Sequence, residues 1–261
     1  MKSDVIKKKN VSFRNDDLVF RNPCLEDQKQ REQNETARKD MVTGISHDLR
    51  TPLTSIQGYI KGILDGIADT EEKQQMYLKT AYQSTKEMNI LLEKLFEFSK
   101  IESGQTQFHM VPVDLSEYTQ AYIAQKEMED ETIEFIYTRE QEILPEVLID
   151  VDQMRRVFDN LLENSIKYSN KDQVQIYVEA RTDKDGVCIS WKDNGAGVDE
   201  DKLTKIFDRF YRCDEARNKK GSGVGLYVVK YIIEQQMGHI DATNDDGLKM
   251  TMYFPIIKES R

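Results

Sequence analysis

The sequence predicts a multi-domain protein in which a helical hairpin, dimerised into a four-helix bundle, is followed by an α+β two-layer sandwich. Apolar residues recur every three or four positions through the first part of the chain, which is the period of helices that share a core. After Gln105-Thr106 the pattern changes to short alternating runs flanked by helical patterns. We therefore expect an unassigned segment over residues 1–25, the helical part over 26–104 and the sandwich over 105–261.

Composition and charge narrow the classes of protein that the chain can be. Of its 261 residues, 38% are hydrophobic and 32% are charged, which suits one or two globular domains. The formal net charge of -10 argues against nucleic acid as the main partner, because a phosphate backbone needs a clustered basic face. Cys24, Cys188 and Cys213 are too few and too widely spaced for a disulfide framework, and they fit a reducing compartment. No apolar run approaches the roughly 20 residues that cross a bilayer, so we expect the chain as given to be soluble.

Two periodic segments predict the helical hairpin. A polar lead-in over residues 26–40 continues without Gly or Pro into an apolar stripe, in which Pro52 would kink the helix. The stripe consists of Ile45, Leu49, Pro52, Ile56, Ile60, Ile63 and Ile67. After a polar connection over residues 68–72, the second stripe consists of Tyr77, Ala81, Met88, Leu91, Leu95 and Phe98. The second helix should end near Ser103-Gly104, since Gly is a common helix stop. Two helices cannot bury such stripes alone, so we expect a dimer.

Alternating runs between helical patterns predict the sandwich. Residues 173–180 and 187–191 alternate apolar and polar positions around a turn containing Asp185-Gly186, which indicates a hairpin. Helical patterns occupy about residues 152–168 and 223–236. A last alternating run contains Met250, Met252 and Phe254. Cys188 and Trp191 fall in the hairpin and are expected in the core.

His47 is the first candidate for chemistry. At about 100° per residue it lies roughly 200° around the helix from Ile45, which predicts a position opposite the apolar stripe. Thr51 is one turn further on the same face, and Asp48 and Arg50 flank the histidine. A solvent-facing imidazole beside a carboxylate and a hydroxyl can act as a nucleophile with an orienting base. By itself, such a residue is more often an inert surface histidine. We assign no role to His109 or His239 beyond ordinary packing or surface positions.

Polar residues and glycines in the second half suggest half of a nucleotide site. Asn160, Asn164 and Lys167 share one face of the helix expected over residues 152–168. Amide oxygens can hold Mg²⁺ and a lysine can meet a phosphate, although a solvated face would show the same spacing. Glycines follow the expected strand in residues 193–197 and open the next helix in residues 221–226. The second segment offers backbone N–H groups to a triphosphate, but it matches neither a Walker loop nor a clean dinucleotide motif.

Five segments, in order, closely resemble the sequence boxes of histidine kinases. They are residues 46–52 (H box, SHDLRTP), 160–168 (N box, NLLENSIKY), 193–197 (DNGAG), 206–212 (F box, IFDRFYR) and 221–226 (GSGVGL). The resemblance covers roughly residues 35–255 and implies the ATP-binding fold shared with DNA gyrase. It departs from the family near the C-terminus, where Met237-Gly238 and Gly247-Leu248-Lys249 replace a Gly-Gly pair and a Gly-x-Gly-Thr segment. The tightness of the last hairpin is therefore in doubt.

The resemblance also implies a role for each candidate residue. His47 would be the phosphoacceptor, Asp48 would accept a hydrogen bond from its imidazole in place of the usual Glu, and Thr51 would place a water for dephosphorylation of the partner. Asn164 would hold the metal, and Asp193 would receive the exocyclic amine of adenine. Residues 213–220 would form a lid over ATP. The remaining nucleotide-binding residues would be Asn160, Lys167, Tyr168, Gly195, Gly197, Tyr211, Arg212, Ser222, Gly223, Val224, Gly225 and Leu226, with Arg212 on a phosphate.

The function implied is that of a histidine autokinase in a two-component phosphorelay. ATP, with Mg²⁺, would supply the γ-phosphoryl group to His47, from which it would pass to an aspartate of a response regulator receiver domain. The expected partners are a second copy of the chain and that regulator, with neither direct nucleic acid nor membrane contact by this segment. The expected location is cytoplasmic, and the sequence leaves open whether a transmembrane sensor precedes it. Two alternatives remain open: a dimeric scaffold that binds ATP without catalysis, and a regulator biased toward phosphatase activity.

Overall fold

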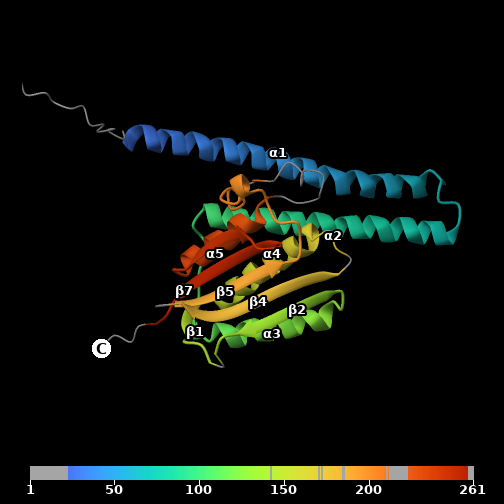
Figure 1. Cartoon of the computed structure of the whole chain (residues 1–261). Coiled ribbons are helices and arrows are strands. Elements are labelled where there is room, and N and C mark those ends of the chain that lie inside the picture. The colour runs from blue at the N-terminus through green and yellow to red at the C-terminus, as the bar shows by residue number, and fades with distance from the viewer. Residues whose placement is uncertain are drawn as a thin grey trace, which may run out of the picture. The chain divides into compact units, whose positions relative to one another are not determined.

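The computed structural model describes residues 23–141, 143–169, 171, 173–183, 186–209, 211 and 223–257, and for residues 23–42 and 47 it describes the backbone only. Helix α1 (Pro23–Leu64) and helix α2 (Glu71–Glu102) form the predicted hairpin (Figure 1). The connection spans residues 65–70, earlier than the expected 68–72, so Ile67 lies outside the helix and is exposed. Helix α1 continues past Pro52, and the kink expected there stays a prediction. Among the described residues, none of the helices is both long and apolar enough to cross a membrane.

The two helices of the hairpin are held close by small residues. The Ser84 hydroxyl donates to the Ser55 hydroxyl oxygen at 3.1 Å, and a Cβ on Gly62 would lie 2.7 Å from the Tyr77 ring. The Thr70 side chain caps the start of α2 by accepting from the Lys73 N–H. Gly104, with φ of 65°, follows the last residues of α2 as the sequence predicts.

The second part is a five-stranded sheet covered by helices, which confirms the predicted sandwich. The strand order is β2 (Ile133–Arg139), β4 (Val174–Asp183), β5 (Gly186–Asp193), β7 (Leu248–Pro255) and β6 (His239–Asn244). Only the β2–β4 pair is parallel among the described strands of this sheet. The helices are α3 (Leu115–Glu129), α4 (Val151–Tyr168) and α5 (Gly225–Gln235), with a short 3-10 helix η1 (Glu200–Lys202). Strands β1 (Val111–Val113) and β3 (Val147–Ile149) pair separately.

Trp191 of β5 is the centre of the core, as expected. It is 1% exposed, and its ring stacks on Phe158 of α4 at 5.7 Å and meets the edge of Phe135 of β2 at 5.8 Å. Its indole N–H donates to the Ser165 hydroxyl at 3.1 Å, which satisfies the one polar atom of the side chain. Because Tyr122 of α3 also packs against Trp191, the helices α3 and α4 lie on the same face of the sheet. This packing fixes the orientation of α4 over β5.

The last hairpin is tight, although the family's glycine pattern is incomplete here. Strands β6 and β7 pair from His239–Tyr253 to Asn244–Leu248, and three residues connect them. The turn places Asp246 at φ 50° and Gly247 at φ 143°, conformations that favour Asn, Asp or Gly. The Asp245 N–H donates to the Gly247 carbonyl at 3.0 Å. The retained Gly247 is thus sufficient to close the turn.

Candidate active site

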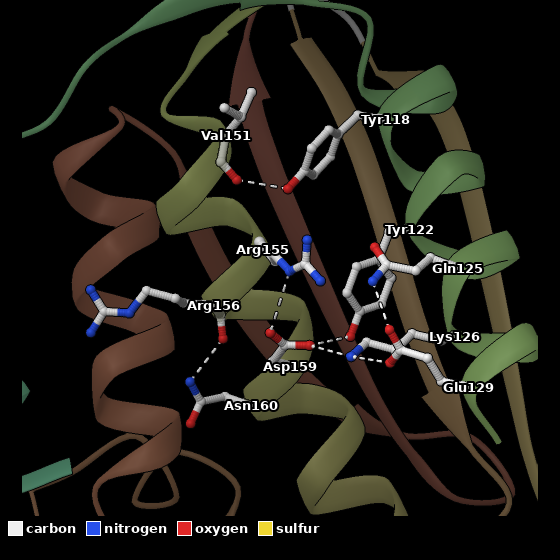
Figure 2. A network of polar contacts seen from close by, with 10 residues as sticks. All are labelled: Tyr118, Tyr122, Gln125, Lys126, Glu129, Val151, Arg155, Arg156, Asp159 and Asn160. Carbon is white, nitrogen blue, oxygen red and sulfur yellow. Dashed lines mark hydrogen bonds and ion pairs between the residues drawn. The ribbon is translucent and has the colours of Figure 1, made fainter. Parts of the chain in front are cut away.

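Helix α4 carries a half-buried polar face next to its buried apolar face. Met154, Phe158 and Leu162 are buried, whereas Asn160 and Asn164 are only half-buried. This arrangement confirms the face that the sequence predicts for the two asparagines. The Asn160 side-chain amide donates to the Arg156 carbonyl at 2.8 Å, one turn earlier in the helix (Figure 2).

Polar contacts from α3 anchor the side of α4 next to Asn160. The Tyr122 hydroxyl donates to Asp159 Oδ1 at 2.9 Å, and Lys126 Nζ lies 3.1 Å from the same oxygen (Figure 2). Burial, with the neighbouring Asp159 charge, raises the pKa of Tyr122, so its hydroxyl stays a donor. The Tyr118 hydroxyl donates to the Val151 carbonyl at 2.7 Å at the start of α4. These contacts complement the packing against Trp191 and keep the Asn160 face turned away from α3.

The Asn164 amide is poised for a ligand. Its Nδ2 atom is buried and has no hydrogen-bond partner among the described residues. Leaving a buried polar group unpaired costs about 1–3 kcal/mol, so a group that binds nearby would recover that cost. Either the oxygen or the nitrogen of an amide can be turned toward such a group. The site therefore fits a bound polar ligand or ion.

The start of α5 lies against this polar face. A Cβ on Gly225 would come within 2.9 Å of Asn160 Oδ1 and 3.9 Å of Asn164 Nδ2, so a larger residue here would displace the Asn160 side chain. Gly223 has φ of 67°, and Val224 caps α5 without a side-chain hydrogen bond among the described residues. The first N–H groups of α5, next to the asparagines, can therefore meet an anion. Leu226 is partly buried against the core.

Asp193, at the end of β5, is a buried carboxylate with one oxygen committed to the backbone. It is 7% exposed, and its Oδ1 accepts from the Gly195 N–H at 2.9 Å and the Leu248 N–H at 3.2 Å. Burial raises the pKa of this carboxyl group, and the two N–H groups offset part of that rise. Its Oδ2 makes no hydrogen bond to a described residue. That oxygen is available to a donor on a ligand.

Close backbone approaches bring the glycine loop to α4 and to the last hairpin. A Cβ on Gly195 would lie 3.2 Å from the Tyr168 carbonyl oxygen, and one on Gly247 would lie 1.9 Å from the Asp193 carbonyl oxygen. Gly197 has φ of 73°. The C-terminal end of α4, the loop after β5 and the β6–β7 turn therefore enclose Asp193.

The remaining candidates are placed to different degrees. The Lys167 ammonium lies 4.7 Å above the Tyr168 ring at the end of α4, and Tyr211 packs against the core. Arg212, Ser222 and the expected lid over residues 213–220 lie outside the described residues. The structure thus places Gly225 against Asn160 and Asn164, and it places Gly195 against Tyr168 and Asp193 at the end of the same helix.

His47 belongs to α1, but its side chain lies outside the described atoms, so its orientation stays a prediction. Ile45 is buried and Thr51 is exposed, as the helical periodicity predicts, and Asp48 is half-buried.

Two features of the site have no signal in the linear sequence. Asn244, at the end of β6, forms hydrogen bonds with Val198 in the loop after β5, across 46 positions of the chain. Helix α2 contacts α4 through two ion pairs, Lys94 with Glu163 at 2.7 Å and Glu97 with Arg156 at 2.8 Å. Both depend on long-range packing, which composition and periodicity do not encode.

Comparison with known protein families matches both parts of the chain. The model of the His Kinase A (phospho-acceptor) domain matches residues 37–104, and that of the histidine kinase-, DNA gyrase B- and HSP90-like ATPases matches residues 149–258. Two sensor protein kinases WalK of Staphylococcus aureus, one of them from strain MRSA252, are 34% identical to this chain over 239 residues and cover 89% of it. The chain spans 38% of one of these relatives and 56% of the other.

Solved structures share the fold. The histidine kinase AdeS of Acinetobacter baumannii matches with a TM-score of 0.61 at 20% identity, covering 81% of this chain and 98% of that one. The histidine kinase ThkA, solved in complex with the response regulator protein TrrA, also matches with a TM-score of 0.61 at 20% identity, covering 94% of this chain and 70% of that one. With both family models matched in the order of the hairpin and the sandwich, the chain belongs to the histidine kinases.

Proposed function

We propose that this chain is the catalytic portion of a histidine autokinase that transfers the γ-phosphoryl group of ATP to His47 and then to a receiver-domain aspartate. Two observations carry the proposal: Asn164 Nδ2 is buried without a partner among the described residues, and the buried carboxylate of Asp193 keeps one oxygen that no described residue occupies. The H box on α1 supplies a histidine to the same chain. A nucleotide site without a nucleophile in the same chain would support only the alternative of a dimeric scaffold that binds ATP without catalysis.

Each end of the nucleotide has a counterpart in the site. Asp193 Oδ2 is free to accept a hydrogen bond from the adenine amine, while Oδ1 stays on the backbone N–H groups. The N–H groups at the start of α5 and the Lys167 ammonium would meet the phosphates, as would Arg212 and Ser222. Asn164 would hold Mg²⁺ through its amide oxygen, and the metal would neutralise charge on the triphosphate. Tyr168, Gly195 and Gly197 would line the base.

The transfer requires a nucleophile from the hairpin. A nitrogen of the His47 imidazole would attack the γ-phosphorus, and the bond to the bridging oxygen would break with its electrons leaving on ADP. Asp48 would accept a hydrogen bond from the other ring nitrogen and so hold the attacking tautomer. In the second transfer, a receiver aspartate would take the phosphoryl group from His47. Thr51 would place the water for the phosphatase reaction.

Exposed apolar residues on the hairpin support a homodimer. Large apolar side chains that stay exposed along α1 and α2 are Leu53, Ile60, Leu64, Met76, Leu78, Tyr82, Ile90 and Phe96. Two hairpins that pack together would bury these side chains in a four-helix bundle. The expected partner in phosphotransfer is a response regulator, as in the ThkA complex, and a cytoplasmic location fits this chemistry.

Incubation of the purified chain with γ-labelled ATP and Mg²⁺ tests the proposal. A label that is stable in base and lost in acid would identify phosphohistidine, and addition of a receiver domain should then move the label to it. Binding of ATP without label would favour the scaffold. Loss of label from a phosphorylated regulator, without autokinase activity, would favour the phosphatase-biased alternative.

A further inference from the structure

Asn244 is an exposed residue whose side-chain amide pairs with the backbone of the loop after β5. Its Oδ1 accepts from the Val198 N–H at 3.0 Å, and its Nδ2 donates to the Val198 carbonyl at 2.6 Å. A side-chain amide that bonds both polar groups of one residue imitates a paired β-strand. Val198 itself packs against the core directly after Gly197. Asn244 therefore fixes the point where the loop after β5 ends.

The same amide also reaches Glu200, two residues further along the chain. Its Nδ2 also donates to Glu200 Oε1 at 3.1 Å, at the first residue of η1. It also touches the loop itself, since a Cβ on Gly197 would lie 2.6 Å from Asn244 Oδ1. One side chain thus contacts the loop at Gly197 and Val198, and the first residue of η1 at Glu200.

This position bears directly on Asp193. The loop that Asn244 closes begins at Asp193 and includes Gly195, whose N–H holds Asp193 Oδ1. The other donor to that oxygen, the Leu248 N–H, belongs to the residue that pairs with Asn244 across β6 and β7. Both N–H groups that orient the carboxylate therefore lie close to Asn244. Gly195 is three residues before Val198, which Asn244 binds, and Leu248 pairs with Asn244 directly.

We propose that Asn244 is a positioning residue for adenine recognition, which holds the loop over residues 194–199 so that Asp193 keeps its Oδ2 free for the base. The inference rests on the proposed function, because it assumes that Asp193 binds adenine. It assigns Asn244 no contact with the nucleotide. Its loss should therefore weaken ATP binding and leave the chemical step unchanged.

Two substitutions separate hydrogen bonding from shape. N244A removes all three hydrogen bonds. N244D preserves the shape and the acceptor for the Val198 N–H, but sets a carboxylate oxygen against the Val198 carbonyl and against Glu200. T243A is the matched control, because Thr243 is the exposed neighbour on the same strand. Wild type, N244A, N244D and T243A are compared in ATP affinity by calorimetry, in KM and kcat of labelling, and in melting temperature.

We expect N244A to raise the KM for ATP by about 2- to 12-fold. Asn244 does not touch the nucleotide, so the expected loss is the weakening of one hydrogen bond at Asp193, by about 0.5–1.5 kcal/mol. The kcat should not change, N244D should bind ATP more weakly than N244A, and T243A should match the wild type. The inference would be overturned if N244D bound ATP as tightly as the wild type. It would also be overturned if both Asn244 variants lost kcat and melting temperature together, because that result would indicate a general loss of structure. D193N, measured in parallel, separates a failure of the Asn244 proposal from a failure of the adenine placement at Asp193. If D193N weakens ATP binding and N244A does not, only the role of Asn244 is wrong; if neither does, the adenine placement itself is wrong.

Discussion

Replacing Asp193 by Asn should weaken ATP binding while leaving the empty protein at least as stable. The Asp193 Oδ1 accepts from two backbone N–H groups, those of Gly195 and Leu248. An asparagine has only one oxygen, and these donors will hold it in the Oδ1 position. Its NH₂ group then occupies the position of Oδ2, where it meets the amine of adenine, and two donors face each other.

The affinity loss can be worked from the bond that disappears. A hydrogen bond to a charged group contributes about 1.5–3 kcal/mol, which corresponds to roughly a 10- to 150-fold increase in the Kd for ATP. Guanine carries a carbonyl where adenine carries the amine, so the NH₂ group of D193N would suit GTP better than the carboxylate does. The ratio of ATP to GTP affinity should therefore fall by more than the ATP loss alone.

Stability should change in the opposite direction. Because burial raises the pKa of Asp193 in the folded state, its ionised form costs stability at every pH above that raised value. The cost declines as the pH falls through the folded pKa and vanishes below the ordinary value of an unfolded Asp. D193N carries no such cost, so at pH 7–8 its melting temperature should equal or exceed that of the wild type.

Calorimetric titration with ATP and GTP, together with thermal unfolding across pH, tests these statements. ATP affinity of the wild type should also weaken as the pH falls through the raised pKa, because only the carboxylate accepts from the amine, and D193N should lack that step. Unchanged ATP affinity in D193N, or an unchanged ratio of ATP to GTP affinity, would refute the placement of adenine at Asp193. A lower melting temperature at pH 7–8 would show that the charge stabilises the fold.

Three further perturbations have defined outcomes. H47Q should abolish acid-labile labelling and leave ATP affinity unchanged, and a label retained in this variant would exclude His47 as the acceptor. N164A should remove most Mg²⁺-dependent ATP binding without lowering the melting temperature, since it deletes a buried donor that has no partner among the described residues; calorimetry with and without Mg²⁺ measures the effect. Exchanging the charges of Glu97 and Arg156 in the double variant E97R/R156E should restore the stability that each single variant loses. We expect a coupling free energy of about 0.2–1 kcal/mol, because the ion pair is part-exposed. Additive effects in denaturant unfolding would mean that the ion pair does not form in solution.

The parts of the fold that follow from local pattern could be predicted. The α1–α2 hairpin follows from its apolar periodicity, and the β4–β5 pairing, with Val178 opposite Trp191, follows from the alternation of apolar residues in both strands. The burial of both faces of β5 does not follow from that alternation. Between residues 107 and 149 the sequence shows no periodicity from which an element could be predicted. The buried face of α3 includes Ser116 and Thr119, which interrupt its apolar stripe. Strands β1 and β3 have three residues each, too few to show alternation.

For the candidate site, too, local sequence pattern predicts some features and long-range packing determines the others. The residues inside continuous motifs, such as Asn160 with Asn164 and Asp193 with Gly195, could be placed on one helix or one loop from spacing alone. What spacing cannot give is the contact between separate motifs, such as Gly225 against Asn160. Asn244 could not be found because its hydrogen bonds depend on the register of β6 beside the loop after β5, a tertiary property.

The tryptophan at the centre of the sandwich is the sole one in the sequence. Tryptophan fluorescence therefore originates in the ATPase fold alone, because the helical hairpin contains no tryptophan. The indole sits on the strand that ends at Asp193, two positions away along β5. Its N–H is bonded to Ser165, one position after Asn164 on α4, so its surroundings join both halves of the candidate site. Nucleotide titrations of the unlabelled chain can be followed optically through this intrinsic fluorophore, without an added dye.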